Sequence, residues 1–146
     1  MRNRILVMAS LLMLCSLVAT QVARAQEPLI VNIPFAFTAG EASLPAGEYR
    51  VQKMDVNNAV LLLRCGDPKA SAFVMTIGTQ GKKQQEESKL VFNRYNNHYF
   101  LSQVWVAGHS TGRELRKTAR EREIAQTAKL EAKDQVILLA SLSLSK

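Results

Sequence analysis

The sequence predicts a mainly β protein, an antiparallel β-sandwich or partly open barrel of six to eight strands with one late α-helix. Three observations support this prediction. Apolar and polar residues alternate through much of the chain, turn-forming residues separate these segments at short intervals, and a helix-forming composition follows only after Gly112. Alternation with a period of two is the pattern of a strand with one buried face.

The first 25 residues are expected to be an export signal outside this fold. Basic residues open the chain, an apolar run covers residues 5–19, and Ala23-Arg24-Ala25 supplies the A-x-A pattern of a cleavage site. The run is shorter than the about 20 residues of a transmembrane helix. We expect a mature chain that starts at Gln26, is periplasmic or secreted, and has no transmembrane segment. An uncleaved anchor and a lipoprotein remain alternatives.

Residues 26–146 are long enough for a single β-rich domain. Loss of the signal would remove three arginines and lower the net charge from +7 to +4, so the charge gives no reason to expect a nucleic-acid partner. The mature chain has one cysteine, Cys65, which excludes an intramolecular disulfide. We expect Cys65 to be a small buried residue near a strand end, with an intermolecular disulfide as the alternative.

The expected strands follow the alternating segments. They cover residues 29–37, 48–56, 59–65, 71–79, 89–95, 98–107 and 135–142. Pro34 cannot donate a ladder hydrogen bond, so the first strand is expected at a sheet edge. Leu44-Pro45-Ala46-Gly47 and Gly66-Asp67-Pro68 are expected turns.

Two Asn-Asn pairs are expected to form two-residue hairpin turns, because asparagine tolerates a positive φ. They are Asn57-Asn58 and Asn96-Asn97. In the second hairpin, Tyr95 is expected to face His98, and Phe92 to face Leu101.

A helix is expected over residues 118–133, where Ala, Arg, Glu, Lys and Gln dominate. Thr118 and Glu121 fit a capping box, and Ile124 and Ala128 are expected to face the sheet. The dense basic run around it is interpreted as a solvated face with internal ion pairs, the alternative being a surface for anionic partners. It comprises Arg113, Arg116, Lys117, Arg120 and Arg122.

Gly108-His109-Ser110-Thr111-Gly112 matches the G-x-S-x-G nucleophile elbow of α/β-hydrolases. The required chain order is serine, acid, histidine, and neither His98 nor His109 follows Ser110. The strands also come before the helix instead of alternating with helices. The match is therefore interpreted as a chance one, in a glycine-flanked exit from a strand, and the protein is expected not to be an enzyme.

Other residue types that carry chemistry are sparse. Two histidines cannot make a zinc site alone, and Asp55 and Asp67 are isolated carboxylates near turns. No catalytic, cofactor-binding or metal-binding residue and no cofactor is predicted. Aromatic residues of one hairpin are expected to be core, with a ligand pocket or sugar platform as the alternative. They are Tyr95, Tyr99, Phe100 and Trp105.

Several segments resemble a family of uncharacterised exported β-rich proteins associated with acidobacteria. The matching segments are 31–37 (VNIPFAF), 44–51 (LPAGEYRV), 99–113 and 121–123. The resemblance implies an exported bacterial β-rich domain and no assigned activity.

The leading functional hypothesis is an exported, non-enzymatic domain with a binding or structural role in the cell envelope or outside it. Envelope components or another exported protein are the expected partners. The alternatives are a carrier of a small apolar ligand with a barrel interior and, as a lesser one, a serine hydrolase that uses Ser110.

Overall fold

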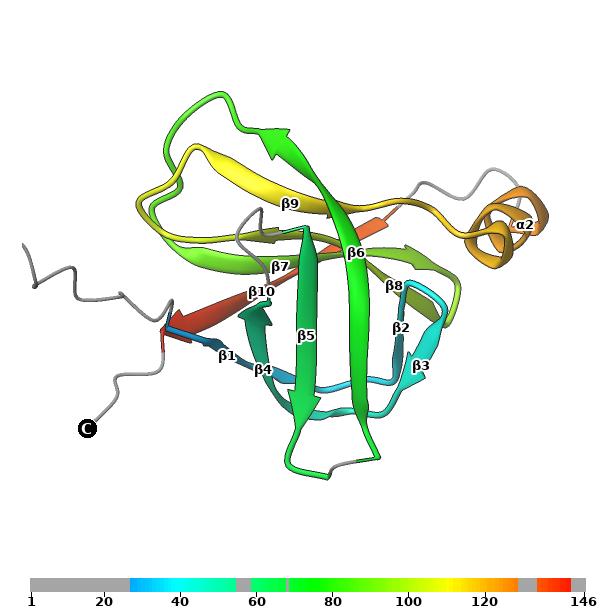
Figure 1. The fold of residues 1–146 in the computed structure, drawn as a ribbon. Coiled ribbons are helices and arrows are strands. Elements are labelled where there is room, and N and C mark those ends of the chain that lie inside the picture. The colour runs from blue at the N-terminus through cyan, green and yellow to red at the C-terminus, as the bar shows by residue number, and fades with distance from the viewer. Residues whose placement is uncertain (1–26, 55–58, 68, 129–133, 143–146) are drawn as a thin grey trace, which may run out of the picture.

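A computed structural model describes residues 27–54, 59–67, 69–128 and 134–142 (Figure 1). The expected export signal and the Asn57-Asn58 turn lie outside these residues. In chain order the elements are β1 (Leu29–Ile33), β2 (Phe37–Ala39), β3 (Ala42–Leu44), β4 (Gly47–Lys53), β5 (Val60–Cys65), β6 (Ser71–Gln80), β7 (Ser88–Tyr95), β8 (His98–Trp105), β9 (Thr111–Leu115), α2 (Ala119–Thr127) and β10 (Asp134–Leu142).

Eight strands form a closed antiparallel barrel in the order β8-β7-β10-β1-β4-β5-β6-β9, and β9 pairs back onto β8. Closure gives each of these strands a neighbour on both sides over at least part of its length, which removes most of the exposed edge of an open sheet. The short antiparallel pair β2–β3 lies outside this ring, and β2 joins β8 in parallel. The predicted mainly β fold with one late helix is confirmed, and the arrangement is a barrel.

The barrel interior is filled by inward-facing side chains that are almost completely buried. Phe92 and Tyr49 have no exposed surface, and the ring of Phe37 packs edge-on against both at centroid distances of 5.4 and 5.2 Å. Edge-to-face packing is a favoured arrangement for aromatic rings. The core cluster draws residues from every strand of the described chain except β10, whose Val136, Leu138 and Ala140 are half-buried against it.

Strand β6 changes partners halfway along its length. Residues from Ser71 to Met75 pair with β5, whereas residues from Thr76 to Gln80 pair with β9. Thr76 stands at this change, and both its N–H and its hydroxyl donate to the carbonyl of Ala59, at 2.7 and 3.0 Å. Figure 1 shows β6 crossing in front of the other strands to reach β9.

The hairpin of β7 and β8 confirms the predicted register. Tyr95 pairs with His98 and Phe92 pairs with Leu101, and Asn96 adopts φ 52° in the turn. The turn before β4 is also confirmed, because β3 ends at Leu44 and β4 begins at Gly47.

The prediction of an edge strand at Pro34 was wrong. Strand β1 ends at Ile33 and lies between β4 and β10, so Pro34 terminates the strand and is not required to donate a ladder hydrogen bond. The chain then turns to form β2, which the alternating pattern had joined to the first strand. Strands β3 and β9 were not predicted.

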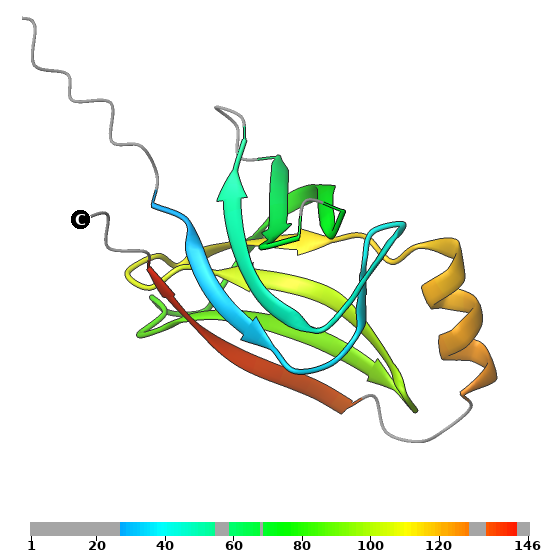
Figure 2. The ribbon, with the colours of Figure 1, turned by 90° about the horizontal axis from the view of Figure 1, so that it is seen from below.

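The late helix is α2, and its N-cap follows the prediction. The hydroxyl of Thr118 accepts from the N–H of Glu121 at 3.1 Å. The Glu121 carboxylate does not complete the capping box. Its Oε1 accepts instead from Asn93 Nδ2 at 2.9 Å and from the Tyr95 hydroxyl at 3.3 Å. Figure 2 shows α2 at one end of the barrel.

A polar contact therefore attaches α2 to the sheet. Glu121 is the buried residue of the helix, and the expected apolar contacts Ile124 and Ala128 are only half-buried. The predicted helix end over residues 129–133 lies outside the described residues. The interpretation of the basic run as a helix face was wrong for Arg113, which belongs to β9 and bonds to Thr76, and for Arg116 and Lys117, which precede α2.

Glu121→Ala is expected to lower the free energy of unfolding by about 2 kcal/mol, because Asn93 and Tyr95 lose a buried acceptor. Urea unfolding measures this change. The matched control is Glu123→Ala, since Glu123 is exposed on the same helix, and its effect should stay within about 0.5 kcal/mol. Equal effects of the two substitutions would contradict the proposed attachment of α2.

Tyr49 is expected to make stability depend on alkaline pH. Burial, helped by the nearby Cys65, raises the pKa of Tyr49 from 10.0 to about 12, and its hydroxyl donates to the carbonyl of Pro45 at 2.8 Å. A raised folded-state pKa stabilises the fold below pH 10.0 and loses that contribution as the pH rises through about 12. Unfolding titrations of the protein and Tyr49→Phe between these values should show a steeper loss for the unsubstituted protein. The same pH dependence of stability in both proteins would contradict the raised pKa of Tyr49.

Candidate functional site

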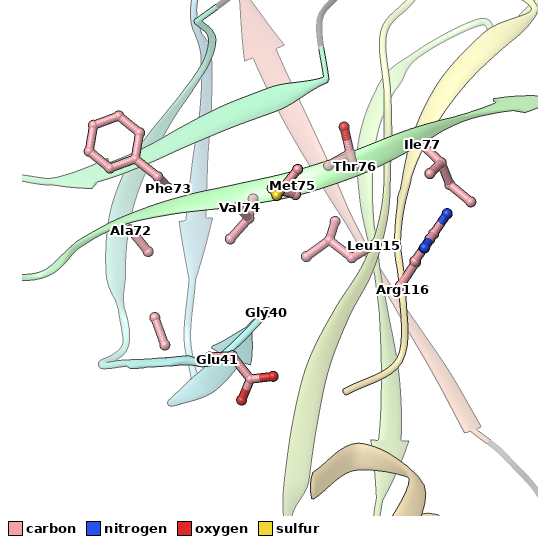
Figure 3. A pocket seen from close by; sticks show the side chains of 11 residues that line it. Gly40, Glu41, Ala72, Phe73, Val74, Met75, Thr76, Ile77, Leu115 and Arg116 are labelled. Atoms are coloured by element: carbon pink, nitrogen blue, oxygen red, sulfur yellow. The ribbon is translucent and has the colours of Figure 1, made fainter. Parts of the chain in front are cut away.

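A cleft of about 710 Å³ lies beside β6. One wall is β6 from Ala72 to Ile77, a second is the β2–β3 turn from Gly40 to Ala42, and a third is the end of β9 at Leu115 and Arg116 (Figure 3). Gly40 is in the left-handed region at φ 59°, and a Cβ there would lie 3.6 Å from Cγ1 of Val74. Glycine thus lets the turn adopt its conformation next to β6.

The cleft exists because the barrel wall is incomplete at this point. Strand β9 pairs with β6 only from Thr76 onward, so the earlier half of β6 has β5 on one edge and no strand on the other within the described chain. Strand β3 lies across the cleft, and its edge away from β2 also has no strand partner among the described residues. Such edges carry backbone N–H and C=O groups that can bind a further molecule.

The lining of the cleft is mostly apolar. Its lining includes the buried side chains of Ala72, Val74 and Leu115. Phe73 and Met75 of β6 also line it and are 69% and 81% exposed. Exposure of large apolar side chains in one place is unusual on a soluble surface and is typical of a binding site.

Two oppositely charged residues mark the border of the cleft. Figure 3 shows the Glu41 carboxylate and the Arg116 guanidinium on different sides of it. Both residues are exposed and form no salt bridge in the described chain. They leave an apolar floor with one acidic and one basic group at the rim, a combination that can orient a bound molecule.

The G-x-S-x-G segment covers the end of the connection from β8 to β9 and the first two residues of β9. It leads from strand to strand, so it lacks the strand-to-helix turn of a nucleophile elbow. The Ser110 hydroxyl accepts from Gln80 Nε2 at 3.2 Å, and the neighbouring His109 is exposed. This geometry agrees with the interpretation of the segment as an exit from a strand.

The structure explains why glycine occupies both positions of the motif. Gly108 adopts φ 80°, which favours glycine. Gly112 lies under the indole of Trp105, where an added Cβ would stand 2.6 to 2.9 Å from three ring carbons. The two glycines therefore serve the turn and the packing of Trp105.

The other predicted candidates stay apart. His98 begins β8 and His109 follows its far end, and Asp67 lies in a turn where its carboxylate accepts from the N–H of Lys69 at 2.9 Å. Asp55 is outside the described residues. Within the described chain, no three His, Cys, Asp or Glu residues lie close enough together to hold a metal ion.

The aromatic residues of the hairpin are core, as predicted. Tyr95, Phe100 and Trp105 are buried. Tyr99 is half-buried and stacks on Phe35 at 3.9 Å between ring centroids. None of them lines the cleft.

Cys65 is half-buried at the end of β5, less buried than expected, and is a free thiol beside the core. The cleft was not predicted from the sequence. The available signal was the exposed face of β6, where the alternation Phe73, Met75, Ile77 places a second apolar face on a strand whose inner face is apolar as well.

Gly112→Ala is expected to destabilise the protein by about 1 to 3 kcal/mol, because the new methyl group would overlap the Trp105 ring. Thermal unfolding followed by tryptophan fluorescence measures this change. Gly66→Ala is the matched control, since a Cβ added at Gly66 would have nothing within 4 Å, and it should leave the transition in place. A stable Gly112→Ala variant would refute the packing role.

In comparisons with known proteins, no family model, no curated protein and no solved structure matches the chain. No helix among the described residues has the length and apolarity to cross a membrane. A function therefore has to be inferred from the barrel and its cleft.

Proposed function

We propose that the protein is an exported, non-enzymatic binding barrel that holds a small apolar molecule in the cleft beside β6. The observation that carries this proposal is the cleft of about 710 Å³ with its largely apolar lining. Pockets for small molecules commonly enclose about 300 to 1,000 Å³ and combine apolar walls with a few polar groups. The cleft fits that description.

The position of the cleft modifies the carrier hypothesis. The core cluster fills the barrel interior with side chains such as Phe92 and Ile33, which have no exposed surface. The cleft instead opens between β6 and the β2–β3 turn. The ligand we propose therefore binds at the gap in the wall, and the packed core gives that gap rigid sides.

The chemistry of the cleft suggests how a ligand would be held. Val74 and Leu115 offer apolar contact, and burial of that surface contributes about 25 cal/mol for each Å². The free edge of β6 offers backbone hydrogen bonds, and Glu41 and Arg116 offer a charged group on different sides. A molecule with an apolar body and a small polar end would use all three features.

Export is part of this proposal and rests on the signal pattern of residues 1–25. An exported carrier would meet small apolar molecules in the envelope or the medium. A second candidate function is that of an interaction domain for another exported protein. The exposed Phe73 and Met75 on the outside of β6 favour it, because exposed aromatic and methionine side chains are enriched in interfaces.

Binding can be tested with n-alkyl alcohols, which are uncharged and apolar. Their titration should shift the amide resonances of residues 40–42 and 72–77 in a saturable way, with stronger binding for longer chains because more apolar surface is buried. Met75→Ser should weaken binding of the longest alcohol about threefold to tenfold, as expected for partial loss of one apolar contact.

Leu139→Ser is the matched control, because Leu139 is 60% exposed on β10 and does not line the cleft. It should bind the alcohols like the unsubstituted protein. Shifts spread over the whole surface, or equal weakening by both serine variants, would refute a ligand site in the cleft. Shifts that are confined to the cleft, and binding that Met75→Ser weakens while Leu139→Ser does not, would support it.

A further inference from the structure

A second feature borders the cleft at Thr76, where two cationic side chains face the inside of the barrel wall. Lys53 ends β4 on the same face as Tyr49 and Val51, which are buried in the core. Lys53 also pairs with Leu61, which is 1% exposed. Because alternate residues of a strand share a face, Lys53 continues the inward row of β4.

Arg113 reaches the same region from β9. It lies two residues before the core residue Leu115, and it pairs with Val104 of β8, which is also in the core. Lys53 and Arg113 are both half-buried, so solvent reaches them although they point inward. Neither residue lines the cleft.

The guanidinium of Arg113 is held in a fixed position. Its Nε donates to the Thr76 hydroxyl at 2.9 Å and its Nη2 donates to the Thr76 carbonyl at 3.1 Å. Thr76 is itself tied to Ala59. The third nitrogen, Nη1, has no hydrogen-bond partner in the described chain, and it lies beside Gly78, whose missing side chain leaves space: an added Cβ would be 3.6 Å away.

The two positive charges have no negative partner among the described residues. Among the described residues, the salt bridge is between Lys83 and Glu86, so it involves neither Lys53 nor Arg113. Burial and, next, the like charge of Arg113 lower the pKa of Lys53. Half-buried like charges without a counter-ion are unfavourable, and an anion between them would relieve the repulsion.

We propose that Lys53 and Arg113 form a binding site for an oxyanion, a carboxylate or phosphate group, at this end of the barrel. Arg113 would present its free Nη1–H groups in a fixed orientation, and Lys53 would add a mobile charge-assisted donor. The site borders the apolar cleft at Thr76, but neither Lys53 nor Arg113 lines that cleft, so this proposal stands or falls separately from the proposed function.

The test is a titration of the purified protein with inorganic phosphate and with acetate, at constant ionic strength, followed by amide and arginine side-chain resonances. We expect saturable shifts at Lys53, Thr76, Gly78 and Arg113. Lys53→Gln and Arg113→Gln should each weaken binding about tenfold, the effect of removing one charge-assisted hydrogen bond. If phosphate binds and acetate does not, the ligand is a phosphate group. If acetate causes the same shifts as phosphate, a carboxylate also fits the site.

Two controls separate this site from general salt effects. Arg64→Gln and Lys69→Gln remove exposed cations elsewhere and should leave the titration unchanged. Arg113→Lys keeps the charge and should still lose most of the binding, because lysine cannot use the two bonds to Thr76 that orient the guanidinium. Shifts that do not saturate, or that the control variants also abolish, would overturn the proposal.

A further variant tests whether the chain supplies its own anion. Asp55 follows Lys53 by two residues. If the unsubstituted protein shows no binding and Asp55→Asn binds phosphate, then an internal carboxylate fills the site and the proposal of an external ligand is wrong. Binding by the unsubstituted protein that Asp55→Asn leaves unchanged would support it.

Discussion

The change of partner along β6 is the constraint on which the rest of the structure depends. One ten-residue strand pairs with β5 through its first half and with β9 through its second, and the barrel closes only because β9 also pairs with β8. Thr76 stands at the change and bonds to Ala59 and Arg113. Because β9 is short, it does not reach the first half of β6, and the β2–β3 pair lies there instead. The cleft is the space between this pair and β6.

This arrangement also explains why the two proposed sites are separate. On the near side of Thr76 the wall lacks a strand and apolar side chains line the gap, which suits an uncharged ligand. Beyond Thr76, β6 pairs with β9, and inward-facing Arg113 of β9 brings a positive charge into the wall. Apolar contact needs no counter-charge, whereas a half-buried guanidinium gains from one. Thr76 therefore lies between an apolar cleft and a cationic site.

Local patterns in the sequence predicted the local structure well. The Asn96-Asn97 turn fixed the register of Tyr95 with His98, because a two-residue turn leaves one pairing for the strands that it joins. The prediction failed where contacts between residues far apart in the sequence determine the structure. Strand β9 combines glycine with three charged or polar residues and becomes a strand only because β6 and β8 flank it. Glu121 looked like a capping residue, and its buried contacts with Asn93 and Tyr95 depend on tertiary structure. The cleft has no sequence pattern of its own, because it forms between segments far apart in the chain.

The proposal that the protein is exported and binds a small apolar molecule in its cleft is best tested by native mass spectrometry of the protein isolated from the periplasm and medium of its own cells. We expect a mass for a chain that starts at Gln26, together with a retained small molecule that apolar solvent extracts. A chain that carries no small molecule in any of these fractions, or that retains residues 1–25, would contradict the proposed function.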